Sequence, residues 1–156
     1  MGTQQILLIV LSVIIVGAAI AVGIQMFNSQ AYSANKSAVA ADAQSFATQV
    51  IQYYKTPTSQ GGAGRSAGTG DGELMSPEKI AEYIGWGAEV DTTTTDTGTY
   101  KIAVGTLTSL PAELAGSTFC ITITGVGNET KGALKPKVVT TVGLPVGKIS
   151  AAVTDK

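Results

Sequence analysis

The side chains that could do chemistry are few in this chain and lie apart from one another. Asp91 and Asp96 flank a run of threonines, and Asp71 comes two residues before Glu73. Carboxylate pairs of this kind can bind calcium, but neither pair has the spacing of an EF-hand loop. We therefore predict no metal site.

Histidine is absent, and Cys120 is the one cysteine among the 156 residues. A lone cysteine cannot form an intrachain disulfide, and metal sites built from cysteine and histidine are excluded. The commonest general acid–base side chain is also missing, although carboxylates, lysines and tyrosines remain. Because no nucleophile–base group containing histidine can be assembled, the sequence predicts a protein that is not an enzyme and needs no cofactor.

Asn35 and Asn128 each begin a triplet that matches the acceptor pattern for N-linked sugar. Such triplets also arise by chance, and Asn128 is the better candidate because it lies in an expected turn. The glycine-rich stretch 56–74 lacks the phosphate-binding pattern GxxxxGK[ST] and follows no predicted strand. We expect this stretch to be a surface loop.

Charge is nearly balanced, with 10 basic and 11 acidic residues, so no nucleic-acid partner is required. Apolar residues make up 44% of the chain and charged residues only 13%. The first charged side chain is Lys36, so much of the apolar content comes before it.

The segment from Ile6 to Ile24 contains Ser12 as its only polar side chain. Its 19 residues would form a helix roughly 28 Å long, close to the ~30 Å thickness of a bilayer's hydrocarbon. A cleaved secretory signal is not favoured, because no basic residue precedes the run and the run is too long. A head of this size cannot enclose a helix that is apolar all round, so we predict a membrane or filament-core helix over residues 1–27.

Residues 28–55 contain neither glycine nor proline and continue the helix as an amphipathic one. Apolar side chains recur at intervals of 7, 4, 3, 4 and 3 or 4, which marks one helix face: Tyr32, Val39, Ala43, Phe46, Val50 and Tyr53 or Tyr54. The opposite face is expected to carry Asn35, Lys36, Asp42, Gln44 and Gln52. Pro57 ends the helix, which therefore covers about residues 3–55 and is roughly 80 Å long.

Residues 56–156 are predicted to form a β-rich head. A short helix is expected from Ser76, its N-cap, to Trp86, with Ile80, Tyr83, Ile84 and Trp86 packed inward. Alternation predicts strands over Thr99–Leu107, Ser117–Val126, Lys137–Val142 and Lys148–Val153. The predicted fold is α+β, with the long helix packed on a small antiparallel sheet.

A helix with an apolar first half and an amphipathic second half, running unbroken into a β-rich head, resembles the type IV pilins. The resemblance covers residues 1–55 closely and implies a subunit that polymerises through its apolar helix. Bacterial pilins have a basic leader and a glutamate at the fifth mature position. Here no basic leader is present, and the fifth residue is Gln5 if the chain starts at Met1, or Leu7 if it is cut after Gly2.

Once an apolar helix leaves the bilayer, only other copies of itself can cover it. Two small-xxx-small pairs would allow close approach between such helices: Gly17 with Ala21, and Ala19 with Gly23. Glycine is also common in membrane helices generally, which is the alternative explanation. Gln4 and Gln5 either bond to neighbouring chains deep in the bundle or mark the lipid headgroup region.

We therefore expect the structural subunit of an extracellular, cell-surface filament, a homo-polymer of identical chains. The resemblance implies that the chain sits in the inner membrane before the pilus assembly machinery extracts it. The alternatives are a single-pass membrane-anchored binding protein and a pseudopilin of a secretion system. Adhesion, motility and DNA uptake are all compatible roles.

Overall fold

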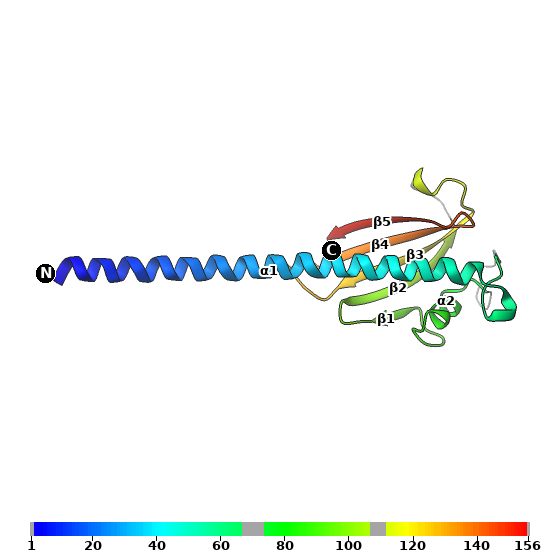
Figure 1. Cartoon of the computed structure of the whole chain (residues 1–156), viewed down its shortest axis with the longest axis horizontal. Coiled ribbons are helices and arrows are strands. Elements are labelled where there is room, and N and C mark those ends of the chain that lie inside the picture. Colours follow the sequence, from blue (N-terminus) through cyan, green and yellow to red (C-terminus); the bar gives the residue numbers. More distant parts are fainter. Residues whose placement is uncertain (1, 67–73, 107–111, 156) are drawn as a thin grey trace.

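The structure, a computed structural model, describes residues 2–66, 74–106 and 112–155. Its helical elements are α1 (Gly2–Lys55), α2 (Pro77–Tyr83) and two 3-10 turns, η1 (Thr58–Gln60) and η2 (Ala112–Leu114). Its strands are β1 (Thr92–Thr94), β2 (Gly98–Thr106), β3 (Phe119–Gly127), β4 (Pro136–Leu144) and β5 (Lys148–Asp155). Figure 1 shows the N-terminal half of α1 projecting from a head that contains all the strands. The predicted α+β fold is confirmed.

The five strands form one antiparallel sheet whose spatial order is the same as their order in the chain. Side chains alternate along the central strand β3, as the pleat requires. Phe119, Ile121 and Ile123 are buried, whereas Cys120 and Thr122 are half-buried on the other face. The inner face of this strand therefore belongs to the core.

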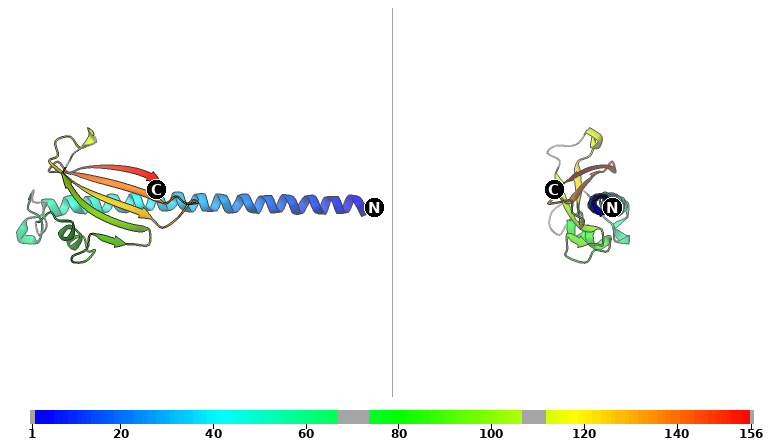
Figure 2. Two further views of the ribbon diagram at one scale, coloured as in Figure 1. Left: turned by 180° about the vertical axis from the view of Figure 1, so that it is seen from behind. Right: turned by 90° about the vertical axis from the view of Figure 1, so that its left-hand side faces the viewer.

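Helix α1 runs along the buried face of the sheet and lies over β3 and β4, with the sheet on one side of it (Figure 2). Its buried residues form an apolar stripe of the predicted Tyr32, Val39, Ala43, Val50, Tyr53 and Tyr54 together with Ala47, which was not predicted, whereas the predicted Phe46 is half-buried. Two alanines at the centre of the stripe let the helix backbone approach the sheet closely. The stripe and the inner sheet face together form the hydrophobic core.

At Gly125, β3 and the helix approach each other closely. A Cβ atom built on this residue would lie 2.7 Å from the Tyr100 ring and 2.8 Å from Cγ1 of Val39. Neither the Tyr100 ring nor the Val39 side chain can move aside into solvent, because both are fully buried. The site therefore requires glycine for reasons of space.

The loop after α1 folds back onto the end of the helix. The backbone N–H of Ala63 donates to the Tyr53 carbonyl at 3.0 Å, and the N–H of Arg65 donates to the Tyr54 carbonyl at 2.8 Å. These bonds satisfy carbonyls that a helix end leaves without internal partners. The first part of the predicted loop 56–74 is thus ordered by the helix, and residues 67–73 of that loop lie outside the described residues.

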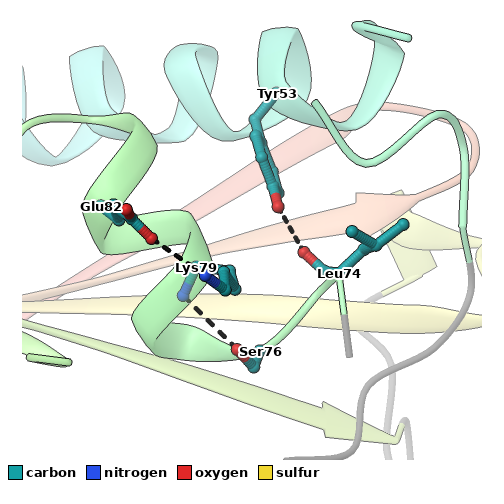
Figure 3. Close-up of polar contacts among 5 residues, drawn as sticks. All are labelled: Tyr53, Leu74, Ser76, Lys79 and Glu82. Atoms are coloured by element: carbon teal, nitrogen blue, oxygen red, sulfur yellow. Dashed lines mark hydrogen bonds and ion pairs between the residues drawn. The ribbon is translucent and has the colours of Figure 1, made fainter. Parts of the chain in front are cut away.

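Figure 3 shows how the segment before α2 is tied to α1. The Tyr53 hydroxyl donates to the Leu74 carbonyl, so the end of the long helix holds the start of the next segment. Ser76 caps α2 as predicted, because its hydroxyl oxygen accepts from the Lys79 N–H at 3.4 Å. Lys79 also pairs with Glu82 at 3.2 Å on the exposed face.

Some element boundaries differ from the prediction. Strand β1 was not expected, because Thr92–Thr94 is a threonine run with no alternation of apolar and polar residues. Strand β4 continues through Leu144 into the predicted turn, where Leu144 is fully buried. Helix α2 ends at Tyr83, whose ring is 37% exposed and lies on the Tyr53 ring rather than inside the core.

Candidate functional site

The N-terminal half of α1 carries a continuous bare apolar surface. Every large apolar side chain from Ile6 to Phe27 is exposed, by 52% to 71%. Among the described residues, this is the one helix that is long and apolar enough to cross a membrane. A helix of this kind fits either a membrane-anchored protein or a filament subunit.

The one polar side chain between Ile6 and Ile24 is satisfied by the helix itself. The Ser12 hydroxyl donates to the carbonyl of Ile9 at 2.8 Å. A serine bonded in this way leaves no polar hydrogen without a partner in lipid or in a dry helix bundle. The bare surface is therefore compatible with surroundings that contain no water.

The five residues predicted to act in assembly all lie in the N-terminal half of α1 and are exposed: Gln4, Gln5, Gly17, Ala21 and Gly23. A Cβ atom at Gly17 or Gly23 would meet nothing within 4 Å. The fold of a single chain therefore gives no steric reason for glycine at these two positions, in contrast to Gly125. Their role in assembly stays a prediction.

Two side chains of α1 clamp the C-terminal end of β5 where the helix enters the head. The Tyr32 hydroxyl donates to Oδ1 of Asp155 at 2.7 Å, and the Lys36 ammonium lies 2.8 Å from the same oxygen. The hydrogen bond from Lys36, followed by the one from Tyr32, lowers the pKa of the Asp155 carboxyl below its ordinary value. The clamp therefore works best with the carboxylate ionised.

Acid is expected to open this clamp. A carboxyl with a lowered pKa in the folded state stabilises the fold fully above its ordinary pKa of about 4, and the contribution is lost as pH falls through the lowered value. Hydrogen-exchange protection at the end of β5, relative to the centre of the sheet, should therefore stay constant from pH 6 down to about pH 4 and fall below that pH. In Asp155→Asn the protection should be weaker at pH 6 and change little with pH. An equal pH-dependent loss in the variant would contradict this assignment.

Two further polar residues hold the flank of α1 to the head. The Asn35 amide donates to the Thr97 carbonyl at 2.8 Å and accepts from the Glu129 N–H at 3.3 Å. Oδ2 of Asp42 accepts from the hydroxyls of Thr97 at 2.6 Å and Tyr100 at 3.0 Å. Burial raises the pKa of the Tyr100 phenol, which keeps it protonated as a donor.

The prediction that placed Asn35, Lys36 and Asp42 on the face away from the head was wrong. Asn35 and Asp42 flank the apolar stripe on one side, where Thr97 and Tyr100 meet them. Lys36 lies in line with the stripe, one turn after Tyr32, where β5 ends. Short polar side chains at the margin of a helix face can therefore meet backbone groups of the sheet ends. Helical periodicity alone does not distinguish such marginal positions from solvated ones.

The two candidate glycosylation sites have different surroundings. Asn35 lies within α1, and both ends of its amide are occupied by the bonds described above. Asn128 is exposed at a bend directly after β3, and its amide donates to the Asp96 carbonyl at 3.1 Å. Modification of either residue stays a prediction, and Asn128 offers the more accessible amide.

The carboxylates singled out from the sequence do not meet in the described part of the chain. Oδ2 of Asp91 lies 3.1 Å from the Lys101 ammonium, whose hydrogen bond lowers the pKa of this carboxyl. Asp71 and Glu73 lie outside the described residues. Within the described residues, no three side chains of histidine, cysteine, aspartate or glutamate gather in a group that could hold a metal ion.

Cys120 lies on the sheet face that points away from α1. Its thiol donates weakly to the Gly105 carbonyl at 3.5 Å, and burial raises its pKa. A raised pKa leaves little reactive thiolate at neutral pH. Cys120 is thus a half-buried residue of β3 with a free thiol.

Comparison of this chain with models of protein families, with curated proteins and with solved structures finds no match. Its architecture, a long apolar helix packed on an antiparallel sheet, is compatible with that of the type IV pilins.

Proposed function

We propose that this chain is the structural subunit of an extracellular filament of the type IV pilin kind, and that its role is not catalytic. The observation that carries the proposal is the continuity of α1, which runs without a break from Gly2 to Lys55. Its first half is bare and apolar, whereas its second half is the core helix of the head. The chain is held in the inner membrane first, and assembly machinery then moves it into a homo-polymer on the cell surface.

Rigidity at the junction supports a filament subunit more than a tethered head. The contacts made by Tyr32, Asn35, Lys36 and Asp42 fix the direction in which the bare helix leaves the head. A protein that is only anchored can function with a flexible linker. In a helical polymer, by contrast, every head must keep the same orientation relative to the bundled helices.

The small residues of the bare helix are arranged for contacts on two sides. Gly17 and Ala21 lie four residues apart on one face, and Ala19 and Gly23 lie four apart on another. At 3.6 residues per turn, the second pair is rotated by about 200° from the first. Close approach on two opposite faces favours an array of many helices over a closed dimer.

The direct test is electron microscopy of material sheared from the surface of cells that produce the protein, combined with mass spectrometry of its subunit. Filaments built from this chain are expected, and the subunit mass will show where the mature chain starts and whether Asn128 carries sugar. Recovery of the chain only as a detergent-extracted monomer would support the membrane-anchored alternative instead.

Gly17→Leu is expected to reduce the yield of sheared filaments strongly, by about tenfold or more, while membrane insertion is retained. Leucine is favourable in lipid, but its side chain separates helices that pack through small residues. Ile20→Leu, a change of similar volume on the same helix, serves as the matched control and should assemble normally. Normal filament yield from Gly17→Leu would show that this position does not face a neighbouring helix.

A further inference from the structure

The loop between β3 and β4 overhangs α1 at the end of the head from which the bare helix projects (Figure 1, Figure 2). Loop and helix form the walls of an open pocket of about 520 Å³. The helix contributes Val22, Gln25, Met26, Asn28 and Ser29, and the loop contributes Thr130, Lys131 and Gly132. Four of the helix positions, Val22, Gln25, Met26 and Ser29, have the spacing i, i+3, i+4 and i+7 and share one helix face.

The pocket has both polar and apolar walls, and the apolar run below it fixes its depth relative to a lipid bilayer. The apolar run from Ile6 to Ile24 is roughly as long as the hydrocarbon of a bilayer is thick. If the helix spans the bilayer, Val22 and Met26 therefore lie at the upper edge of the hydrocarbon. Gln25 and Ser29 then lie at the level of the lipid headgroups, on the side of the head.

The loop offers a positive charge at the same level. Lys131 is exposed and makes no ion pair with any residue that the structure describes. The nearby Asp155 is held by Lys36 and Tyr32. Lys135 lies in the same loop, where Glu129 is the one acidic side chain.

The turn that carries Lys131 is well defined. The backbone N–H of Lys131 donates to the Leu134 carbonyl at 2.9 Å, and the Leu134 N–H donates back at 3.3 Å. Gly132 between them has a φ of +68°, which glycine adopts without strain. The Leu134 side chain is 47% exposed at this turn, so an apolar and a cationic group are presented together.

We propose that this pocket binds the headgroup of an anionic phospholipid in the leaflet that faces the head. The Lys131 ammonium pairs with the lipid phosphate, the side chains of Gln25 and Ser29 donate hydrogen bonds to headgroup oxygens, and Val22 and Met26 contact the first methylenes of the acyl chains. This inference rests on the membrane-inserted stage of the proposed function.

Native mass spectrometry of the full chain in detergent tests the proposal, with phosphatidylglycerol and phosphatidylcholine as the two lipid probes. The wild-type chain should retain phosphatidylglycerol in preference to phosphatidylcholine. Lys131→Gln should weaken retention of phosphatidylglycerol about fivefold, the effect of one lysine near an anionic surface. Lys148→Gln removes an exposed lysine at the opposite end of β5 and serves as the control that should behave like wild type.

Equal retention of the two lipids by the wild-type chain, or unchanged retention in Lys131→Gln, would overturn the proposal. Displacement of bound phosphatidylglycerol by millimolar inorganic phosphate would overturn it as well, because the pocket would then recognise a free anion rather than a lipid. Sedimentation of cell fractions without detergent distinguishes failure of the proposed function from failure of the lipid site alone. A chain found neither in the membrane fraction nor in filaments contradicts the proposed function too, whereas an inserted chain without anionic preference contradicts only the lipid site.

Discussion

Replacing Ile14 by aspartate is expected to abolish filament formation while the head stays folded. Ile14 lies in the middle of the bare helix, is 62% exposed in the single chain, and makes no contact with the head. In lipid, an aspartate at the centre of a helix costs about 3 kcal/mol. In a bundle the charge is buried without a partner, which costs several kcal/mol in every subunit. At about 1.4 kcal/mol per tenfold, this corresponds to at least a hundredfold loss of assembly.

The measurement for Ile14→Asp is the yield of sheared filaments, with circular dichroism of the detergent-extracted chain as the check on folding. Ile14→Leu keeps the volume and polarity of the site and should assemble like wild type. Ala41→Asp introduces the same charge on an exposed position in the head half of α1, and extracted monomer of this variant should also stay folded. Filaments of Ile14→Asp at wild-type yield would show that the bare helix is not buried in the polymer.

The second large effect is expected at the contact between the sheet and the helix. Gly125→Val should destabilise the head by about 3 kcal/mol, the upper end of the usual range for overpacked cores. The new side chain would have to displace the buried Tyr100 ring or Val39 on α1. For a chain of this size, the melting temperature should fall by roughly 10 °C.

Thermal unfolding of the full chain in detergent, followed by circular dichroism, measures this effect. Gly105→Val is the matched control, because Gly105 also lies in a strand but a Cβ there would meet nothing within 4 Å. The control should melt within a few degrees of wild type. Equal destabilisation by both substitutions would mean that loss of glycine from a strand, and not contact with the helix, causes the change.

The long helix and most of the sheet could be predicted because their patterns are strong. The stripe that includes Val39, Ala43 and Val50 repeats for about six turns without glycine or proline, so it identified the face that packs on the sheet. Alternation in β3 was equally clear, and its buried and half-buried faces are as expected. Strand β1 was not predicted, because three successive threonines show no alternation of apolar and polar residues.

The polar clamps of the junction could not be predicted from the sequence. Asp155 meets Tyr32 and Lys36 only because β5 returns along the sheet to the level where α1 enters the head. That level depends on the register of four strand pairings, which local patterns do not determine. The pocket beside Lys131 was missed for the same reason, since its two walls are about a hundred residues apart in the chain.

The bare half of α1, in contrast, could be found from composition alone. No pattern in the sequence distinguishes a helix that stays in lipid from one that is later covered by its own copies. The structure adds two observations that bear on this choice: the bare half is a rigid extension of the head, and Gly17 and Gly23 have no packing role within one chain. Both favour the polymer.

Electron cryomicroscopy of sheared surface material at a resolution that traces helices tests this account most directly. We expect a filament in which residues 2–31 of neighbouring copies pack against one another around the axis, with α1 continuous into each head on the outside. A filament built from another protein, or a helix that bends sharply between Ile24 and Val39 so that its bare half is not in the core, would contradict the account.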